Sequence, residues 1–306
     1  MVRLRQFSFD GDGQAGDARQ QLLITGGVHG DEFEPIAAIR RLIELFEARD
    51  AQVTGFRGRV TFVPIVNEAA FLRGHRCAED GLDLARTCPG KADGSVTEQT
   101  AFALSELIRS ADFYVDLHTG GTELSVFPLT GYVLHRDADV LAVQRGMARA
   151  FNLPVVWGTA GNLDGRSLSV ARDANVPAIY CEYLGSATCS PDGVDAYVDG
   201  CLNVMAELGM LDREPPANRV KHTIENPAPG SGHMQVCNPS PVDGFFEPAV
   251  ELGAEVRTGN LLGTVTSVDG SDKVAIPADQ DGVVLVLRTF PRVTSGSSVG
   301  VVAASQ

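Results

Sequence analysis

The first two thirds of the chain alternate short apolar runs with segments of helical periodicity. Short apolar runs bounded by turn residues are typical of buried strands, whereas apolar residues at helical spacing are typical of amphipathic helices. The predicted strands cover residues 21–25, 59–66, 112–117, 154–157 and 178–183. The predicted helices cover residues 35–48, 95–109, 137–151 and 191–209. This alternation predicts an α/β fold with a mixed, mostly parallel sheet flanked by helices.

The pattern changes after residue 212. The segment Arg213–Asn218 contains two adjacent prolines and is typical of a linker. From about residue 220, valine-rich runs separated by glycine, asparagine, aspartate and proline replace the helical periodicity, which predicts an all-β domain. We therefore expect two domains, a catalytic α/β domain over residues 1–212 and a C-terminal β domain over residues 220–306.

The most specific motif, GGVHGDE at Gly26–Glu32, lies where the first predicted strand ends and a helix begins. Functional sites in open α/β sheets gather at the carboxyl ends of the strands. His29 and Glu32 share a glycine-lined turn, and His118 ends a later predicted strand, so the three side chains can converge. Two imidazoles and one carboxylate form a zinc site that keeps a fourth position for water. We expect one Zn²⁺ ion per chain.

A hydrolytic zinc site also needs a base and a group that stabilises developing negative charge. Glu182 follows apolar residues of the strand predicted over 178–183, where an acidic residue is out of pattern. A carboxylate there can take a proton from water and return it to a leaving amine. The loop over residues 67–90 supplies cations that can stabilise an oxyanion, namely Arg73, Arg76 and Arg86. Solvated loop charge is the alternative, and it is the interpretation that we favour for Arg73.

Together, His29-Gly-Asp-Glu32, Asp116-Leu-His118, the segment Asp83–Gly90 and Glu182 resemble the succinylglutamate desuccinylase/aspartoacylase family. That family belongs to the zinc carboxypeptidase-like superfamily, and the resemblance covers roughly residues 20–210. It implies a zinc-dependent amidohydrolase, a deacylase acting on a small anionic N-acylated amino acid. It also implies zinc on His29, Glu32 and His118, with Glu182 as general base and acid.

The resemblance assigns roles to arginines as well. Arg76 matches the arginine that polarises the scissile carbonyl, and Arg86 matches the arginine that pairs with the substrate carboxylate. Arg172 is predicted as a second carboxylate contact, with a surface position on a helix as the alternative. Ala85 and Cys88 stand where the family usually has asparagine and an aromatic residue, so the identities of the acyl group and the amino acid stay open.

Asp116 also belongs to the matching motif. It lies two residues before His118, and we expect it to point to the opposite face of the strand, in a structural role. A contact with a zinc ligand is the alternative.

The C-terminal segment has a resemblance of its own. Residues 242–284 resemble the barrel-sandwich pattern of biotinyl and lipoyl domains, and Lys273 lies near the place of their modified lysine. A carrier or interaction protein built on this module, with a degenerate N-terminal site, is therefore one alternative function. A metallocarboxypeptidase that acts on peptides is the other. A C-terminal domain over the active-site entrance would disfavour peptide substrates.

Composition narrows the partners and the cellular locations that the protein can have. The chain has 306 residues, with 39 acidic against 25 basic side chains and a formal charge of -14. This balance argues against a nucleic-acid partner, for which a basic patch is expected. No apolar run approaches the length of a membrane span, and no signal-peptide pattern is present. The six cysteines form no C-x-x-C pair, so we expect reduced thiols, a cytoplasmic location and no membrane partner, and we leave open a homo-oligomer.

Overall fold

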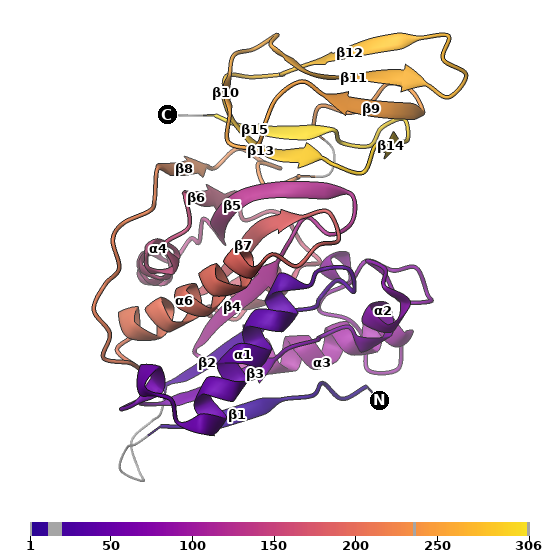
Figure 1. Cartoon of the computed structure of the whole chain (residues 1–306). Coiled ribbons are helices and arrows are strands. Elements are labelled where there is room, and N and C mark those ends of the chain that lie inside the picture. The colour runs from indigo at the N-terminus through magenta and orange to yellow at the C-terminus, as the bar shows by residue number, and fades with distance from the viewer. Residues whose placement is uncertain (1, 12–19, 235–236, 305–306) are drawn as a thin grey trace.

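The computed structural model describes residues 2–11, 20–234 and 237–304 (Figure 1). Its larger sheet runs in the order β1-β3-β2-β4-β7-β5-β13-β10, with β6 and β8 added beside β5 and β15 beside β13. The strands of this sheet are β1 (Phe7–Asp10), β2 (Gln21–Thr25), β3 (Arg59–Val63), β4 (Phe113–His118), β5 (Leu124–Val133), β6 (Val155–Thr159), β7 (Ala178–Gly185), β8 (His222–Asn226), β10 (Glu255–Val256), β13 (Gly282–Arg288) and β15 (Gly300–Ala303).

Helices cover both faces of the α/β part of this sheet (Figure 1). One hydrophobic core lies under α1 (Glu34–Ala48), α4 (Ala138–Phe151) and α6 (Pro191–Glu207). A second core lies under α3 (Val96–Ser110) and α5 (Ser167–Asp173). The predicted capping box opens α3, where the Ser95 hydroxyl accepts a hydrogen bond from Glu98 N and the Glu98 carboxylate accepts one from Ser95 N. Within the described ranges, no helix combines the length and the apolar character needed to cross a bilayer.

The central strands run parallel and end at one edge of the sheet. β3, β2, β4 and β7 pair in parallel, whereas β1 is antiparallel to β3 and β5 is antiparallel to β7. His118 at the end of β4 therefore lies beside Glu182 of β7 in the register. The turn after β2 and a short helix, α2 (Glu68–Arg73), lie at the same edge. The mixed, mostly parallel sheet flanked by helices confirms the predicted fold class.

The C-terminal part contains a second, antiparallel sheet. It has the order β12-β11-β9-β14, formed by β9 (Gly244–Pro248), β11 (Leu261–Ser267), β12 (Lys273–Pro277) and β14 (Arg292–Val293). Its apolar face packs on β10, β13 and β15 around a core that includes Phe246, Val265 and Val284. Two antiparallel layers thus enclose one core, in agreement with the expected C-terminal β module.

The two parts are joined more closely than the predicted boundary suggests. β8 starts at residue 222, inside the predicted C-terminal domain, yet it pairs in parallel with β6 of the α/β sheet. β13 pairs with β5, so that Val286 lies opposite Val126. The linker-like segment 213–218 therefore leads back to the first sheet, and the separate β module begins beyond residue 226.

The sequence pattern did not predict β5, although this strand connects the two parts. Its ten residues include Pro128 and Gly131, which interrupt the apolar run that identifies a strand. One edge of β5 pairs with β7, and the other pairs first with β13 and then with β6. A β-bulge between Val126 and Leu129 accommodates the irregularity. Pairing with β7, β13 and β6 thus forms the β5 strand although its local sequence only weakly favours a strand.

We expect the α/β part and the C-terminal part to unfold in one transition, because they share a hydrophobic core. Leu285 of β13 is fully buried in the cluster that contains Trp157 of β6, the single tryptophan of the chain. Leu285→Ala should lower the free energy of unfolding by about 2–5 kcal/mol. Urea unfolding followed by Trp157 fluorescence and by far-UV circular dichroism should then shift to one common, lower midpoint.

The matched control is Val268→Ala, at an exposed hairpin position in the same part of the chain. It should change the free energy of unfolding by less than about 0.5 kcal/mol. A fluorescence midpoint that Leu285→Ala leaves unchanged would show that the α/β part unfolds independently.

Candidate metal centre

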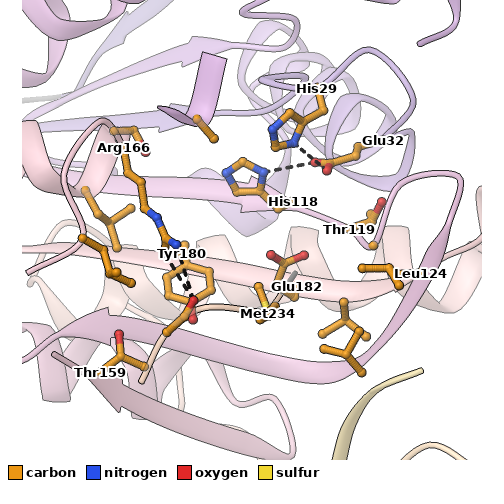
Figure 2. Close-up of a pocket in the computed structure, with 18 of the residues that line it drawn as sticks. His29, Glu32, His118, Thr119, Leu124, Thr159, Arg166, Tyr180, Glu182 and Met234 are labelled. Carbon is orange, nitrogen blue, oxygen red and sulfur yellow. Dashed lines mark hydrogen bonds and ion pairs between the residues drawn. The ribbon is translucent and has the colours of Figure 1, made fainter. Parts of the chain in front are cut away.

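Three buried side chains converge at the carboxyl edge of the sheet. His29 and Glu32 come from the turn between β2 and α1, and His118 is the last residue of β4. Glu32 bridges the two imidazoles: its Oε1 lies 2.7 Å from His29 Nδ1 and its Oε2 lies 3.1 Å from His118 Nδ1. One potential ligand atom from each residue lies within 4.8 Å of the other two (Figure 2). The three residues predicted from the sequence are therefore brought together as one cluster.

Glycine makes this turn possible. Gly27 has a φ of 62°, in the left-handed region that side chains other than glycine adopt reluctantly. Gly30 packs so closely against the backbone of Ala70 that a Cβ atom would clash with it. The chain can thus reverse within a few residues after β2 and place His29 and Glu32 on the same side.

The outer nitrogen of each imidazole faces a second carboxylate. His29 Nε2 lies 3.1 Å from Asp83 Oδ1, and His118 Nε2 lies 3.1 Å from Asp116 Oδ2. When the outer nitrogen donates a hydrogen bond to a carboxylate, the Nδ1 lone pair is left to face a metal ion. Each carboxylate therefore fixes both the tautomer and the orientation of a potential ligand.

The expectation that Asp116 faces away from His118 was wrong. Residues two apart in a strand point to the same face, because side chains alternate with a period of two. Asp116 is fully buried and also accepts hydrogen bonds from the hydroxyls of Thr25 (2.8 Å) and Ser167. It contacts a candidate metal ligand, which was the alternative reading.

The charge balance of the cluster favours a divalent cation. Glu32, Asp83 and Asp116 contribute three carboxylates around the two imidazoles, and Arg76 contributes one guanidinium. Burial opposes ionisation of Glu32, and positive charge beside it, from a protonated imidazole or from a bound cation, lowers its pKa. A buried, ionised carboxylate bridging two imidazoles of fixed tautomer is a donor set suited to zinc.

Glu182 lies beside this cluster on β7. Burial raises the pKa of its carboxyl group to about 8, and the neighbouring His118 acts in the opposite direction. Its Oε2 atom is buried and has no hydrogen-bond partner among the described residues. In Figure 2 the carboxylate is turned toward His118 and Glu32. A cation held there would lower the pKa of Glu182 and favour its basic form at neutral pH.

Arg76 reaches the cluster from the loop after α2. Its Nε and Nη2 donate to Asp83 Oδ2 at 3.2 and 3.0 Å, and its Nη1 lies 3.9 Å from Glu32 Oε1. Burial alone would lower the pKa of this guanidinium, but the Asp83 carboxylate raises it. Asp83 thus orients both His29 and Arg76, although the sequence reasoning gave it no role of its own.

The cluster opens into a cavity of ≈ 110 Å³. His29, Glu32, Arg76, His118 and Glu182 all line it. Residues 232 and 234, which follow β8, and Val286 of β13 form part of its wall, so the C-terminal part of the chain helps to enclose the cavity.

Two further guanidiniums line the cavity, from Arg86 and Arg166. Burial lowers the pKa of Arg86, and the positive charge of Arg166 lowers it further. Arg86 Nη1 donates to the Ala85 carbonyl at 2.7 Å, while Arg166 makes long contacts of 3.4 and 3.5 Å with the Gly232 carbonyl. Two neighbouring cations at the cavity wall, a half-buried Arg166 and a more exposed Arg86, form a favourable place for an anion.

Arg172 does not line the cavity, contrary to its predicted contact with the substrate. It lies on α5, where its guanidinium pairs with Asp164 and Asp173 at 2.8 Å each and donates to the Gly161 carbonyl. Arg166, six residues earlier, is the arginine that the structure brings to the cavity. The position of Arg166 in the sequence could have identified it, because this residue follows the carboxyl end of β6, at the edge of the sheet where the other site residues gather.

Tyr180 also lines the cavity and was not predicted. It lies two residues before Glu182 on β7, so the period of the strand puts both side chains on one face. Its ring lies against Gly131 of β5, where a Cβ atom would clash with the ring. Burial and the Glu182 carboxylate raise the pKa of its hydroxyl, which is therefore a neutral hydrogen-bonding group.

Comparisons with known proteins agree with this geometry. The N-alpha-acetyl-L-2,4-diaminobutyric acid deacetylase of Halomonas elongata is 31% identical over an alignment of 289 residues, which covers 92% of this chain and 81% of that protein. The product-bound structure of the ectoine utilization protein EutE (DoeB) from Ruegeria pomeroyi is 28% identical, covers 97% of this chain and 87% of that chain, and superposes with a TM-score of 0.85.

A succinylglutamate desuccinylase/aspartoacylase structure from Rhodobacter sphaeroides is 28% identical, with a TM-score of 0.82 and coverage of 94% of this chain and 86% of that chain. The model of the succinylglutamate desuccinylase/aspartoacylase catalytic domain matches residues 18–208. This match spans more than half of the chain and includes His29, Glu32, His118 and Glu182. The chain belongs to the succinylglutamate desuccinylase/aspartoacylase family.

Proposed function

We propose that the protein is a zinc-dependent deacylase that hydrolyses the amide bond of a small N-acylated amino acid. The observation that carries the proposal is the buried His29-Glu32-His118 cluster, with the partly unpartnered carboxylate of Glu182 beside it. The deacetylase name of the Halomonas elongata relative supports the same class of reaction.

His29, Glu32 and His118 would hold the metal ion. A bound zinc ion supplies Lewis acidity, which polarises the substrate carbonyl and makes water more acidic. Asp83 and Asp116 keep the two imidazoles in the tautomer and orientation that binding requires, through contacts of 3.1 Å each.

The chain's own residues carry the proton transfers. Glu182 takes a proton from the attacking water, whose oxygen bonds to the acyl carbon, and then gives the proton to the nitrogen as the C–N bond breaks. The products are a carboxylic acid and an amino acid. Arg76, held by Asp83, presents a fixed positive charge to the carbonyl oxygen as negative charge develops on it.

Arg86 and Arg166 would bind the carboxylate of the substrate. The mutual repulsion of these two neighbouring guanidiniums is relieved when an anion lies between them, and the fork of each group suits a carboxylate. We do not retain Arg172 in this role, because its guanidinium is engaged on α5.

The structure favours a small substrate over a peptide. The cavity wall includes Gly232, Met234 and Val286, which come from the part of the chain after β8. A metallocarboxypeptidase needs an open groove for a long peptide, whereas the C-terminal part of this chain occupies one wall of the cavity.

A carrier function of the C-terminal module has no comparable support. Lys273 is exposed at the start of β12 and lies 3.8 Å from Glu247. A cytoplasmic location and a homo-oligomer stay predictions.

Removal of the metal should destabilise the protein. Zinc at about 100 times its dissociation constant stabilises the folded state by about 2.7 kcal/mol, because it binds the folded chain alone. Chelation should therefore lower the thermal midpoint by about 5 °C, and added zinc should restore it.

His29→Ala should abolish this zinc-dependent shift. His75→Ala changes an exposed histidine outside the cluster and should keep the shift. A zinc-dependent shift that survives in His29→Ala would mean that the metal binds elsewhere.

Glu182→Gln should lower kcat by about 100- to 10,000-fold while the zinc content stays near one per chain, because the amide cannot accept the proton. Turnover of an N-acyl amino acid and metal analysis of the same sample give both values. Glu34→Gln, at another buried glutamate outside the cavity, is the matched control and should keep turnover. Full activity of Glu182→Gln with zinc bound would refute the mechanism.

Arg166→Gln should raise KM by about 10- to 100-fold, because a charged hydrogen bond to the substrate carboxylate is lost. Arg172→Gln removes an arginine from the same region but outside the cavity, and should change KM less than about twofold. Steady-state kinetics on one N-acyl amino acid compare the two variants. A larger effect from Arg172→Gln would restore the original prediction.

A further inference from the structure

The cavity has two ends, which lie on opposite sides of Glu182. Glu182 of β7 pairs with Leu129 of β5. Val126 and Val133 lie before and after Leu129 along β5, and both line the cavity. β5 therefore extends along the cavity wall, with Glu182 between its two ends.

The end beyond Val133 is cationic. Val133 pairs with Thr159 of β6, and Gly232 packs beside Thr159. The Arg166 guanidinium contacts the Gly232 carbonyl, and Arg86 lies close enough for its pKa to respond to Arg166. We call this region the cationic arm, and it is where the proposed function puts the carboxylate of the substrate.

The other end is apolar. Val126 pairs with Val286 of β13, and both line the cavity together with Leu124 and Met234. The same residues pack in one hydrophobic cluster. Figure 2 shows Leu124 on one side of Glu182, with Arg166 and Thr159 on the other. We call Leu124, Val126, Met234 and Val286 the apolar arm.

The charged residues of the described cavity lining do not reach the apolar arm. Besides the two histidines they are Glu32, Glu182, Arg76, Arg86 and Arg166, and each belongs to the metal cluster, its immediate neighbourhood or the cationic arm. Arg288 of β13 lies opposite Leu124 in the register, but its guanidinium is engaged by the Glu123 carboxylate and by two backbone carbonyls. A carboxylate in the apolar arm would therefore have no arginine of the cavity lining beside it. Burying an unpaired charge is costly, whereas burying methylene groups there is favourable.

We infer that the apolar arm binds the acyl group, and that the enzyme selects uncharged aliphatic acyl groups and rejects dicarboxylic ones such as succinyl. The inference rests on the proposed function and specifies its substrate class. An amide at Glu182 whose amino-acid carboxylate lies in the cationic arm directs its acyl group to the opposite side. The C-terminal part of the chain contributes two of the four arm residues, and so takes part in acyl selection.

Butyryl and succinyl groups form a matched pair, since each has four carbons and they differ in ending with a methyl or a carboxylate. The zinc-loaded full-length enzyme is assayed on N-butyryl and N-succinyl derivatives of alanine, aspartate, glutamate and 2,4-diaminobutyrate. For each amino acid that is accepted, kcat/KM should favour butyryl by at least about 50-fold. A succinyl derivative hydrolysed as well as its butyryl partner would overturn the inference.

Binding to the Glu182→Gln variant separates this inference from the proposed function. Calorimetry on the same pairs should show tighter binding of the butyryl derivatives. If they bind more tightly but the wild-type enzyme hydrolyses none of them, the proposed function fails and the assignment of the apolar arm stands. Equal or tighter binding of the succinyl derivatives overturns the assignment.

A charge introduced at Leu124 tests the location of the arm. Leu124 is half-buried at the start of β5, so an arginine there can extend toward solvent. Leu124→Arg should narrow the butyryl preference by at least about 10-fold, because it supplies the missing cation. Leu124→Gln is the neutral control and should leave the preference within about threefold. An unchanged preference in Leu124→Arg, or equal changes in both variants, would overturn the assignment; unfolding midpoints verify that both variants fold.

Discussion

The bridge that Glu32 forms between His29 and His118 is the constraint on which the site depends. It buries one carboxylate between two imidazoles, with Glu32 oxygens 2.7 Å from His29 Nδ1 and 3.1 Å from His118 Nδ1. Such a cluster is stable only when its charges are balanced, and the chain supplies more negative than positive groups around it. The charge of the cluster is set jointly by the outer carboxylates of Asp83 and Asp116, by Arg76 and by a divalent cation. A change in any one of these groups therefore alters the charge that the others must balance.

The sheet supplies the rigidity that this cluster needs. His118 and Glu182 lie side by side in a parallel register, and the turn after β2 is fixed by the close approach of Gly30 to the backbone of Ala70. Because these positions belong to buried strands and a packed turn, the donor atoms are preorganised before any ligand arrives. The geometry of His29, Glu32, His118 and Glu182 therefore follows from the core of the protein, whereas Arg76 and Asp83 reach the cluster from the loop after α2.

The sequence predicted the parts of the site that obey local rules. His29, Glu32, His118 and Glu182 end or follow strong strand patterns, and parallel strands bring such positions to one edge. What it missed depends on contacts between distant segments: β5 is interrupted by proline and glycine, and the place of β8 beside β6 is set by pairing alone. The prediction of Arg172 as a substrate contact rested on its position ahead of Glu182 in the sequence, which does not reveal which side of α5 faces the cavity.

The pairing of β13 with β5 has a consequence for the order in which the protein is completed. During synthesis the α/β segments leave the ribosome first and can begin to fold as a unit. The edge of β5 that later receives β13, and the wall position of Val286, stay open until nearly the whole chain has been made. A nascent or truncated chain without β13 therefore lacks the Val286 wall of the candidate cavity and leaves one edge of β5 exposed to aggregation.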